Sequence, residues 1–210
     1  TQLLLDSDLD AEQRQYAELI SESGHSMVAL MNDILDISKI DAGQMTLTNE
    51  PIDIRHSIEG SVRLMKAAAA QKGLKLESQY DESLPQTIYG DQLRIRQILS
   101  NLIGNAIKFT QDGGISVHAR KIGLGNHELI EFAISDTGIG MSPEGIAKAL
   151  TKFGQVDSSL SRKHDGTGLG LPLTKGIVEL HQGTLELESA PGQGTKVTLS
   201  FPAERLTYLM

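Results

Sequence analysis

Residues 11–41 carry a regular pattern of apolar and small side chains. From Tyr16 to Ile37 these positions return in alternating steps of four and three, the spacing of the contact seam in a coiled coil or helical bundle. Asp10 is placed to cap the start of this helix, Gly43 stands where helices commonly end, and residues 2–5 predict the tail of an earlier helix. The alternative, a core helix that packs on its own domain, stays open. Further apolar residues widen the stripe and favour a four-helix bundle: Ala17, Leu19, Met31 and Leu35.

Downstream of Gly43 the pattern changes to alternating strand and helix periods. It predicts strands at 45–49, 74–80, 114–121, 127–135, 184–189 and 195–201, with Pro51 ending the first. It predicts helices at 53–71, 92–109 and 172–180, with Asp91 capping the second. The hairpin at 114–135 and the terminal pair favour antiparallel pairing, so a doubly wound parallel sheet fits less well. We expect an α/β fold, a two-layer sandwich with helices covering one face of a mixed sheet, at 44–210, after a helical segment at 1–43.

Composition narrows the functional classes. The chain has 39% hydrophobic and 22% charged residues but only 4% aromatic residues and no Trp, so Leu, Ile, Val and Ala must build its core. A net charge of −8 disfavours nucleic acid as a partner. The absence of Cys excludes disulfides and thiolate metal sites and fits a reducing, cytoplasmic setting. No apolar run reaches about 18 residues, so we expect this segment to make no membrane contact, although a longer parent protein could be anchored.

Glycine is concentrated in one part of the chain. Eleven of the 21 glycines fall between Gly138 and Gly194, and one use for such clustering is close approach of backbone N–H groups to phosphates. The dinucleotide pattern G-x-G-x-x-G fails, because Pro143 and Leu173 stand where its third glycine would be. The Walker pattern G-x-x-x-x-G-K-[ST] does not occur.

Five short segments remain, and they share one order and spacing with a known family. They resemble the N box, first glycine box, F box, second glycine box and closing glycine turn of the ATP-binding domain of sensor histidine kinases. That domain belongs to the gyrase, Hsp90, histidine kinase and MutL superfamily, and the resemblance, over about residues 45–203, implies its Bergerat-type fold. The segments are Asn101–Thr110, Asp136–Met141, Lys152–Gln155, Gly166–Leu171 and Gly192–Thr195.

The resemblance implies roles for three side chains on the 92–109 helix. Asn101 and Asn105 stand four residues apart and therefore share one helix face. The family's pattern makes Asn105 the ligand of Mg²⁺, through an amide oxygen that suits this hard cation. Lys108 can direct a positive charge at the ATP phosphates that bind this Mg²⁺. Asn101, Asn105 and Lys108 are therefore the expected catalytic residues. The alternatives are an Asn105 that only bonds within the helix and a Lys108 that is a solvated surface charge.

The same resemblance assigns the remaining nucleotide contacts. Asp136 is expected to accept a hydrogen bond from the adenine amino group, while Gly138 and Gly140 let the chain turn beside the ring. Residues 153–170 resemble the ATP lid, and we expect 157–165 to be the least ordered internal segment. The family commonly has Gly where this chain has Asp165, and Arg162 could instead be a mobile surface charge. The other residues expected to bind ATP are Phe109, Arg162, Lys163, Gly166, Thr167, Gly168, Leu169, Gly170 and Thr195.

Residues 1–43 resemble the end of the dimerisation and phosphotransfer region of these kinases. Asn32–Gly43 is similar to the closing part of its second helix. The family's phosphoacceptor string does not occur in this chain; it consists of His, an acidic residue, an apolar residue, Arg, Thr and Pro. His25 is followed instead by Ser-Met-Val-Ala. The resemblance implies transfer of the γ-phosphoryl group of Mg²⁺-bound ATP to a histidine absent from this chain, and then to a response-regulator receiver domain. It also implies a homodimer, formed through the helical hairpin of the parent protein.

Two other functions remain open. One is an ATPase of the gyrase or Hsp90 type, which the sequence disfavours because Asn101 stands where those enzymes have the Glu that activates water. The other is a nucleotide-binding pseudokinase that acts only as an interaction module. The five intact boxes argue against it.

Overall fold

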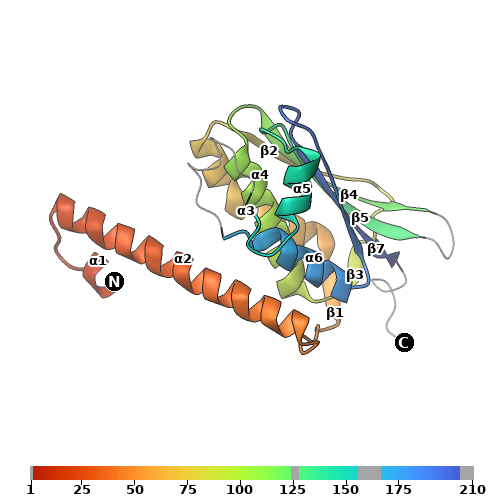
Figure 1. Ribbon diagram of the computed structural model, residues 1–210, viewed down its shortest axis with the longest axis horizontal. Helices are drawn as coiled ribbons and strands as arrows, with labels where there is room; N and C mark the ends of the chain where they lie inside the picture. The colour runs from red at the N-terminus through yellow and green to blue at the C-terminus, as the bar shows by residue number, and fades with distance from the viewer. Residues whose placement is uncertain (1, 124–127, 156–166, 204–210) are drawn as a thin grey trace. The chain divides into compact units, whose positions relative to one another are not determined.

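The computed structural model describes residues 2–123, 128–155 and 167–203 (Figure 1). The chain divides into two compact units, Thr1–Gln44 and Met45–Met210. The first contains two helices, and the second contains every strand that the described residues form.

In the first unit, a short helix α1 (Gln2–Leu5) precedes the long helix α2 (Ala11–Asp41), and the predicted helix is confirmed. Asp10 caps it as expected: its carboxylate accepts from Gln13 N at 2.8 Å, and the Gln13 amide oxygen accepts from Asp10 N at 3.2 Å. Gly43 follows the helix with φ +64°, a conformation that glycine adopts at little cost. The seam residues Tyr16, Ile20 and Met27 are 56%, 60% and 66% exposed, so this chain leaves much of the apolar stripe uncovered.

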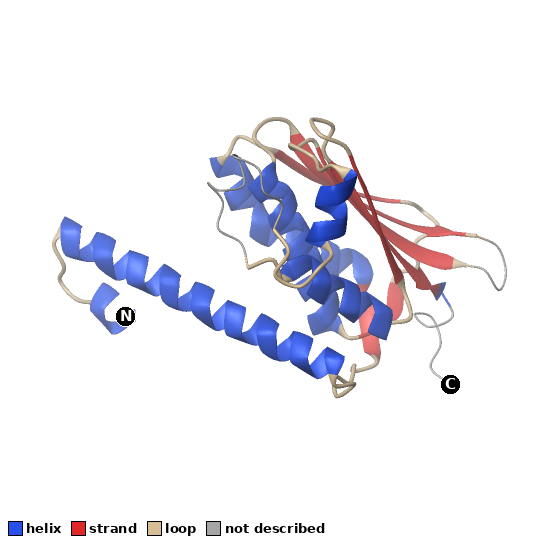
Figure 2. Ribbon diagram, in the orientation of Figure 1, coloured by secondary structure: helices blue, strands red, loops and turns tan. Residues whose placement is uncertain are grey.

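The second unit is the predicted two-layer sandwich. Its five-stranded sheet has the order β2-β4-β5-β7-β6, with β2 and β4 parallel and the other pairs antiparallel. Three helices lie on one face of this mixed sheet (Figures 1 and 2). The helices are α3 (Ile54–Gln71), α4 (Gln92–Phe109) and α6 (Gly170–Leu180), and the strands are β2 (Lys75–Tyr80), β4 (Gly114–Ile122), β5 (Leu129–Asp136), β6 (Thr184–Ser189) and β7 (Thr195–Pro202).

The core lies between these helices and the sheet and is aliphatic, as the composition predicts. Strand alternation turns Ile115, Val117 and Ala119 of β4 inward, each at most 2% exposed. The apolar side of α4 is equally buried, from Ile95 to Ile107. Two of the few aromatic side chains, Phe132 and Phe201, meet in this core with their ring centroids 5.6 Å apart. These contacts hold α4 in a fixed rotation about its axis, which decides where its polar side points.

Two sequence predictions about the first strands of this unit are wrong. No strand forms at 45–49; β1 is Glu50–Asp53, includes Pro51, and pairs antiparallel with β3 (Thr87–Gly90), which the pattern did not predict. Pro51 is tolerated because each strand of a two-stranded ladder has one side without a hydrogen-bonding neighbour. A short helix, α5 (Pro143–Ala149), was also missed within the glycine-rich stretch. Both β3 and α5 are too short to display a hydrophobic period.

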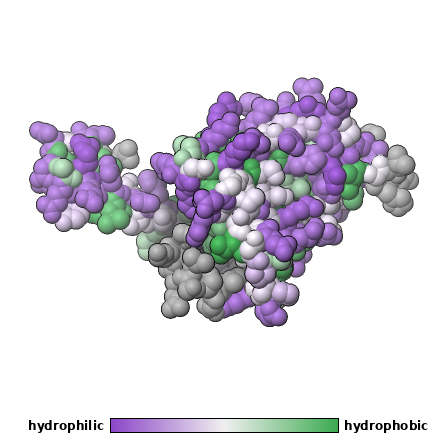
Figure 3. All heavy atoms as spheres, turned by 90° about the horizontal axis from the view of Figure 1, so that it is seen from above, coloured by the Kyte–Doolittle hydropathy of each residue, from purple (hydrophilic) through white to green (hydrophobic). Residues whose placement is uncertain are grey.

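One face of the molecule can be described by the hydropathy of its residues (Figure 3). On the face drawn in Figure 3, hydrophilic residues cover most of the second unit, with apolar residues showing between them. Within the described ranges, no helix is both long enough and apolar enough to cross a membrane.

Asp91 should contribute stability that depends on pH. Its two carboxylate oxygens accept from Arg94 N at 3.0 Å, which caps α4, and from Thr48 N at 3.1 Å, which holds the segment before β1. Burial raises the pKa of Asp91, but these hydrogen bonds outweigh it and leave the pKa below its usual value of 3.8. At pH 7, Asp91→Asn should cost about 1–3 kcal/mol, because the new NH₂ group cannot accept from Thr48.

The stabilisation by Asp91 requires the ionised carboxylate, because its folded-state pKa is depressed. It should be fully present above the usual pKa and lost as pH falls through the lowered value, so the gap between the two proteins should close below pH 3.8. Urea unfolding at several pH values measures the gap. Asp53→Asn is the matched control, since Asp53 caps α3 through one bond, from His56 N, that Asn can keep. A gap independent of pH would contradict this account.

Candidate functional site

One side of α4 carries the predicted polar residues. Asn101, Asn105 and Lys108 are half-buried, while Leu102, Ile103, Ala106 and Ile107 on the other side are buried in the core. Asn105 Nδ2 donates to Asn101 Oδ1 at 3.4 Å, so the two amides adjoin on one helix face as predicted. This arrangement occupies the Asn105 donor group and leaves its Oδ1 as an acceptor.

Asn101 also connects α4 to the start of α6. Its Nδ2 donates to Thr174 Oγ1 at 2.7 Å, and Thr174 lies one turn into α6. A Cβ at Gly170 would overlap Asn101 Oδ1, so only glycine allows this approach. The helix N-terminus is therefore held beside the polar side of α4.

The N-terminus of α6 differs from the starts of the other longer helices. Helices α2, α3, α4 and α5 all have a side chain that accepts from their first N–H groups, whereas the cap residue of α6, Leu169, provides no such bond. The first N–H groups of a helix and its dipole together favour an anion. Leu169 is 1% exposed, so its side chain anchors the turn and only its backbone could face a ligand.

The remaining described residues of the second glycine box shape the turn before α6. Gly168 has φ +68°, its carbonyl accepts from Phe153 N at 3.1 Å, and Thr167 Oγ1 accepts from Leu169 N at 3.2 Å. The structure thus brings Thr167, Gly168 and Gly170 together at this terminus. Arg162, Lys163 and Gly166 lie outside the described residues, as does the segment 157–165 that was expected to be the least ordered part of the lid.

Asp136, at the end of β5, lies where three backbone segments meet. Its Oδ1 accepts from Gly138 N at 2.8 Å and from Thr195 N at 3.2 Å, which leaves Oδ2 for a further donor. Burial raises the pKa of Asp136 above its usual value, although the two N–H donors act in the opposite direction. A Cβ at Gly194, where φ is +76°, would overlap the Asp136 carbonyl oxygen. The predicted residue Thr195 therefore contacts this carboxylate through its backbone.

The first glycine box is wedged between α4 and the closing glycine turn. Ile139 N donates to Phe109 O at 3.2 Å, and a Cβ at Gly138 would lie 2.5 Å from that same oxygen. Gly140 has φ +63°, and a Cβ there would overlap the carbonyl oxygen of Ala190. Phe109 thus fixes the loop through its carbonyl, while its ring centroid lies 5.0 Å from Lys108 Nζ.

Sequence reasoning missed three hydroxyl residues that hold these segments together. Ser189 Oγ accepts from Met141 N and donates to Gly194 O, both at 2.8 Å. Thr137 Oγ1 donates to Asp112 O at 2.9 Å and accepts from Gly114 N at 3.1 Å. Thr174, the partner of Asn101, is the third. The position of Thr174 one turn after Gly170 is a usable signal, but isolated residues such as Ser189 and Thr137 give none.

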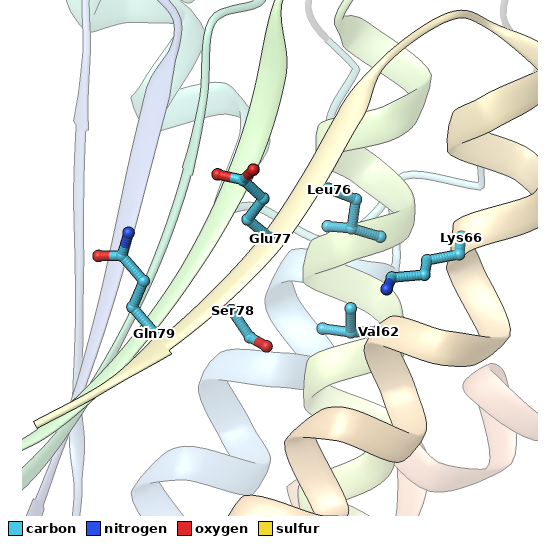
Figure 4. A pocket seen from close by; sticks show the side chains of 6 residues that line it. All are labelled: Val62, Lys66, Leu76, Glu77, Ser78 and Gln79. Atoms are coloured by element: carbon cyan, nitrogen blue, oxygen red, sulfur yellow. The ribbon is translucent and has the colours of Figure 1, made fainter.

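Two other observations limit where a ligand could bind. A hollow of about 350 Å³ between α3 and β2 is lined by Val62, Lys66 and residues 76–79, and it contains no predicted site residue (Figure 4). Among the described residues, no group of three or more His, Cys, Asp or Glu side chains could hold a metal ion. Asn105 Oδ1 could hold a cation together with ligands from a bound molecule, such as phosphate oxygens and water.

Two family models match the chain. The histidine kinase-, DNA gyrase B- and HSP90-like ATPase model matches residues 90–205, and the His Kinase A (phospho-acceptor) domain model matches residues 1–43. Among curated proteins, the signal transduction histidine-protein kinase BarA of Escherichia coli (strain K12) is 38% identical over 196 residues, covering 93% of this chain and 21% of BarA. The non-motile and phage-resistance protein of Caulobacter vibrioides is 42% identical over 196 residues, covering 92% of this chain and 23% of that protein. The chain thus spans about a fifth of these relatives.

Solved structures agree with these matches. The crystal structure of full-length ShkA in complex with AMPPNP has a TM-score of 0.79 and 32% identity, covering 95% of this chain and 41% of ShkA. Acinetobacter baumannii histidine kinase AdeS also supports the fold. Its TM-score is 0.69 at 20% identity, and the match covers 94% of this chain and 87% of AdeS. The chain therefore belongs to the histidine kinase-, DNA gyrase B- and HSP90-like ATPase family, as its five boxes predicted.

Proposed function

We propose that this chain is the ATP-binding catalytic part of a sensor histidine kinase, which transfers the γ-phosphoryl group of ATP to a histidine. Residues 44–210 form its catalytic domain, and residues 1–43 form the end of its dimerisation and phosphotransfer region. The observation that carries this proposal is the N-terminus of α6, to which no described side chain is shown as a cap. The hydrogen bond between Asn101 and Thr174 holds it beside the Asn101–Asn105 face. An anion-binding helix end and an amide oxygen for a cation thus lie together, as a metal-bound triphosphate requires.

At the end of the site proposed to hold the nucleotide base, Asp136 is the residue that selects adenine. Its Oδ1 is used by Gly138 N and Thr195 N, so Oδ2 accepts from the adenine amino group, which guanine does not present at the same position. Gly138 and Gly140 keep the adjacent backbone free of side chains beside the ring. The glycine turn at 192–194 closes behind them through Gly192 N, which donates to Ile139 O at 2.7 Å.

At the phosphate end, Asn105 Oδ1 is the one protein ligand proposed for Mg²⁺. The geometry fits, because Asn105 Nδ2 is turned toward Asn101 and Oδ1 is left to coordinate. A bound cation would supply positive charge that offsets the charge of the phosphates. Lys108 adds a positive charge from the last turn of α4, and the first N–H groups of α6 hold phosphate oxygens. Arg162 and Lys163 are proposed to assist from the lid.

Asn101 favours phosphoryl transfer over hydrolysis. A neutral amide cannot take up a proton as a carboxylate can, so Asn101 provides no general base for water. Asn101 is also occupied structurally, since its Nδ2 donates to Thr174. We infer that the acceptor is a histidine on a phosphotransfer helix, and that an aspartate of a receiver domain then takes the phosphate.

The exposed stripe of α2 supports a further part of this proposal. Tyr16, Ile20 and Met27 are all more than half exposed, and an amphipathic helix of this length gains stability by burying such a stripe against other helices. We propose that in the parent protein this helix belongs to the hairpin that forms a homodimer.

A mixing experiment tests the proposed function. The chain, labelled ATP and Mg²⁺ are incubated with a separate fragment that carries a phosphoacceptor histidine helix of the same kinase class. Label should appear on the fragment as an acid-labile, base-stable phosphate, while the chain alone should release phosphate much more slowly than about 1 s⁻¹. Sustained release at that rate or faster, without transfer to the fragment, would identify an ATPase instead.

Asn105→Ala should abolish transfer and remove the gain in ATP affinity that Mg²⁺ provides. The fold should survive, because among the described residues this side chain hydrogen-bonds only to Asn101, at 3.4 Å. Calorimetric titration of ATP with and without Mg²⁺ measures the effect. Asn105→Asp keeps an oxygen at the same position and is the matched control, which should retain a metal-dependent gain. An Asn105→Ala variant with the full Mg²⁺-dependent gain would show that the metal is held elsewhere.

Asp136→Asn should change the stability of the fold and the affinity for ATP in different ways. Because burial raises the pKa of Asp136, its ionised form opposes folding at neutral pH, so the variant without nucleotide should be as stable as the original or more so. The difference should fade as pH falls below the usual value of 3.8, where the carboxylate is protonated whether the chain is folded or unfolded. ATP affinity should nevertheless fall about tenfold to a hundredfold, as expected when a charge-assisted hydrogen bond is lost. Equal affinity of the original chain for ATP and GTP would refute the role.

A further inference from the structure

The C-terminal end of α4 is completed by a residue from another helix. The last four carbonyls of a helix have no partner within it. Here Ala106 O accepts from Thr110 N at 3.1 Å and from Thr110 Oγ1 at 2.7 Å. Phe109 O accepts from Ile139 N at 3.2 Å. The two carbonyls between them both accept from Lys72 Nζ, Ile107 O at 2.8 Å and Lys108 O at 3.0 Å.

The position of Lys72 follows from how α3 ends. Lys72 is the C-terminal cap of α3, and Gly73, with φ +70°, turns the chain sharply into β2. Helices α3 and α4 pack side by side on the sheet, so a lysine at the end of one can reach the end of the other (Figure 1). The backbone beside it is fixed, because Lys75 N donates to Gly113 O at 3.1 Å, in the loop that follows α4.

This bond affects the two residues assigned to the phosphates. A lysine in the last turn of a helix commonly bonds the terminal carbonyls of its own helix. In α4, Lys72 Nζ donates to two of these carbonyls from outside the helix, and Lys108 Nζ lies 5.0 Å from the Phe109 ring centroid. The Lys72 ammonium also lies at the negative end of the α4 dipole, where it offsets repulsion between these carbonyls and an approaching phosphate.

We propose that Lys72 is a positioning residue for phosphoryl transfer. It holds the last turn of α4 so that Asn105 and Lys108 present their polar groups to the metal-bound phosphate chain, and it touches neither ATP nor the metal itself. The inference rests on the proposed function, because it assigns Lys72 to the support of the same phosphate-binding face. Both helices are needed for this support, since the Lys72 ammonium group comes from the end of α3 and the supported side chains, Asn105 and Lys108, come from α4.

The test compares Lys72→Met with Lys66→Met. Both variants remove one positive charge from the α3 region, but the exposed Lys66 lies beside the hollow at β2 rather than at the end of α4 (Figure 4). ATP affinity is measured by calorimetry with and without Mg²⁺, well below the melting temperature of each variant. Lys72→Met should lose about threefold to fivefold in affinity for Mg²⁺-bound ATP and less for metal-free ATP. Lys66→Met should match the original chain in both titrations.

Two further measurements keep the result specific. Lys72→Arg, which can donate to both carbonyls, should recover most of the lost affinity, so the inference does not depend on the methionine variant folding well. In the mixing assay, Lys72→Met should lower the transfer rate at saturating ATP as well as the affinity. Equal affinities of the methionine variants for Mg²⁺-bound ATP, or an equal loss with and without metal, would overturn the assignment. Failure of the original chain to bind ATP would refute the proposed function instead.

Discussion

The close approach of three backbone segments around Asp136 is the constraint on which the proposed adenine-binding end of this domain depends. The carboxylate holds Gly138 N and Thr195 N, and the loop after it must pass between the end of α4 and the turn at 192–194. Side chains at Gly138, Gly140 or Gly194 would overlap backbone or carboxylate oxygens there. The spacing of these glycines is therefore set by steric exclusion, and the raised pKa of Asp136 is the electrostatic cost of burying the charge at this junction.

At the end of the site proposed to hold the phosphates, side chains rather than backbone segments fix the arrangement of the helices. Asn101 spans from α4 to Thr174, and the absence of a Cβ at Gly170 permits the two helices to approach. Helix α4 connects both ends of the site, because its middle holds the start of α6 and its last carbonyl holds Ile139. Its apolar side is buried against the sheet, so its rotation and its position along the axis are both set by the core. Small displacements of α4 would therefore move the start of α6 and the loop at Ile139 together, and with them both ends of the proposed nucleotide site.

Sequence patterns were sufficient wherever a period or a fixed spacing carried the information. The bounds of α4, its cap Asp91, the mixed sheet and the facing pair Asn101 and Asn105 all followed from them. They failed for elements too short to repeat, such as β3, and for Pro51, whose position in a strand depends on having one side unpaired. Single polar residues that join distant segments have no local signature. Ser189 and Lys72 are examples, since their partners lie 48 and 35 residues away along the chain.

The identity of residue 101 shows how structure and chemistry constrain each other here. An amide can donate to Thr174 and accept from Asn105 at the same time, whereas a carboxylate can only accept. A carboxylate at 101 would also place negative charge beside Gly170, at the positive end of the α6 dipole, where it would compete with phosphate for the same N–H groups. Under the proposed function, the neutral amide leaves that end of the helix to the nucleotide and supplies no general base to water. The residue that joins α4 to the start of α6 is thus also the residue that we propose disfavours hydrolysis.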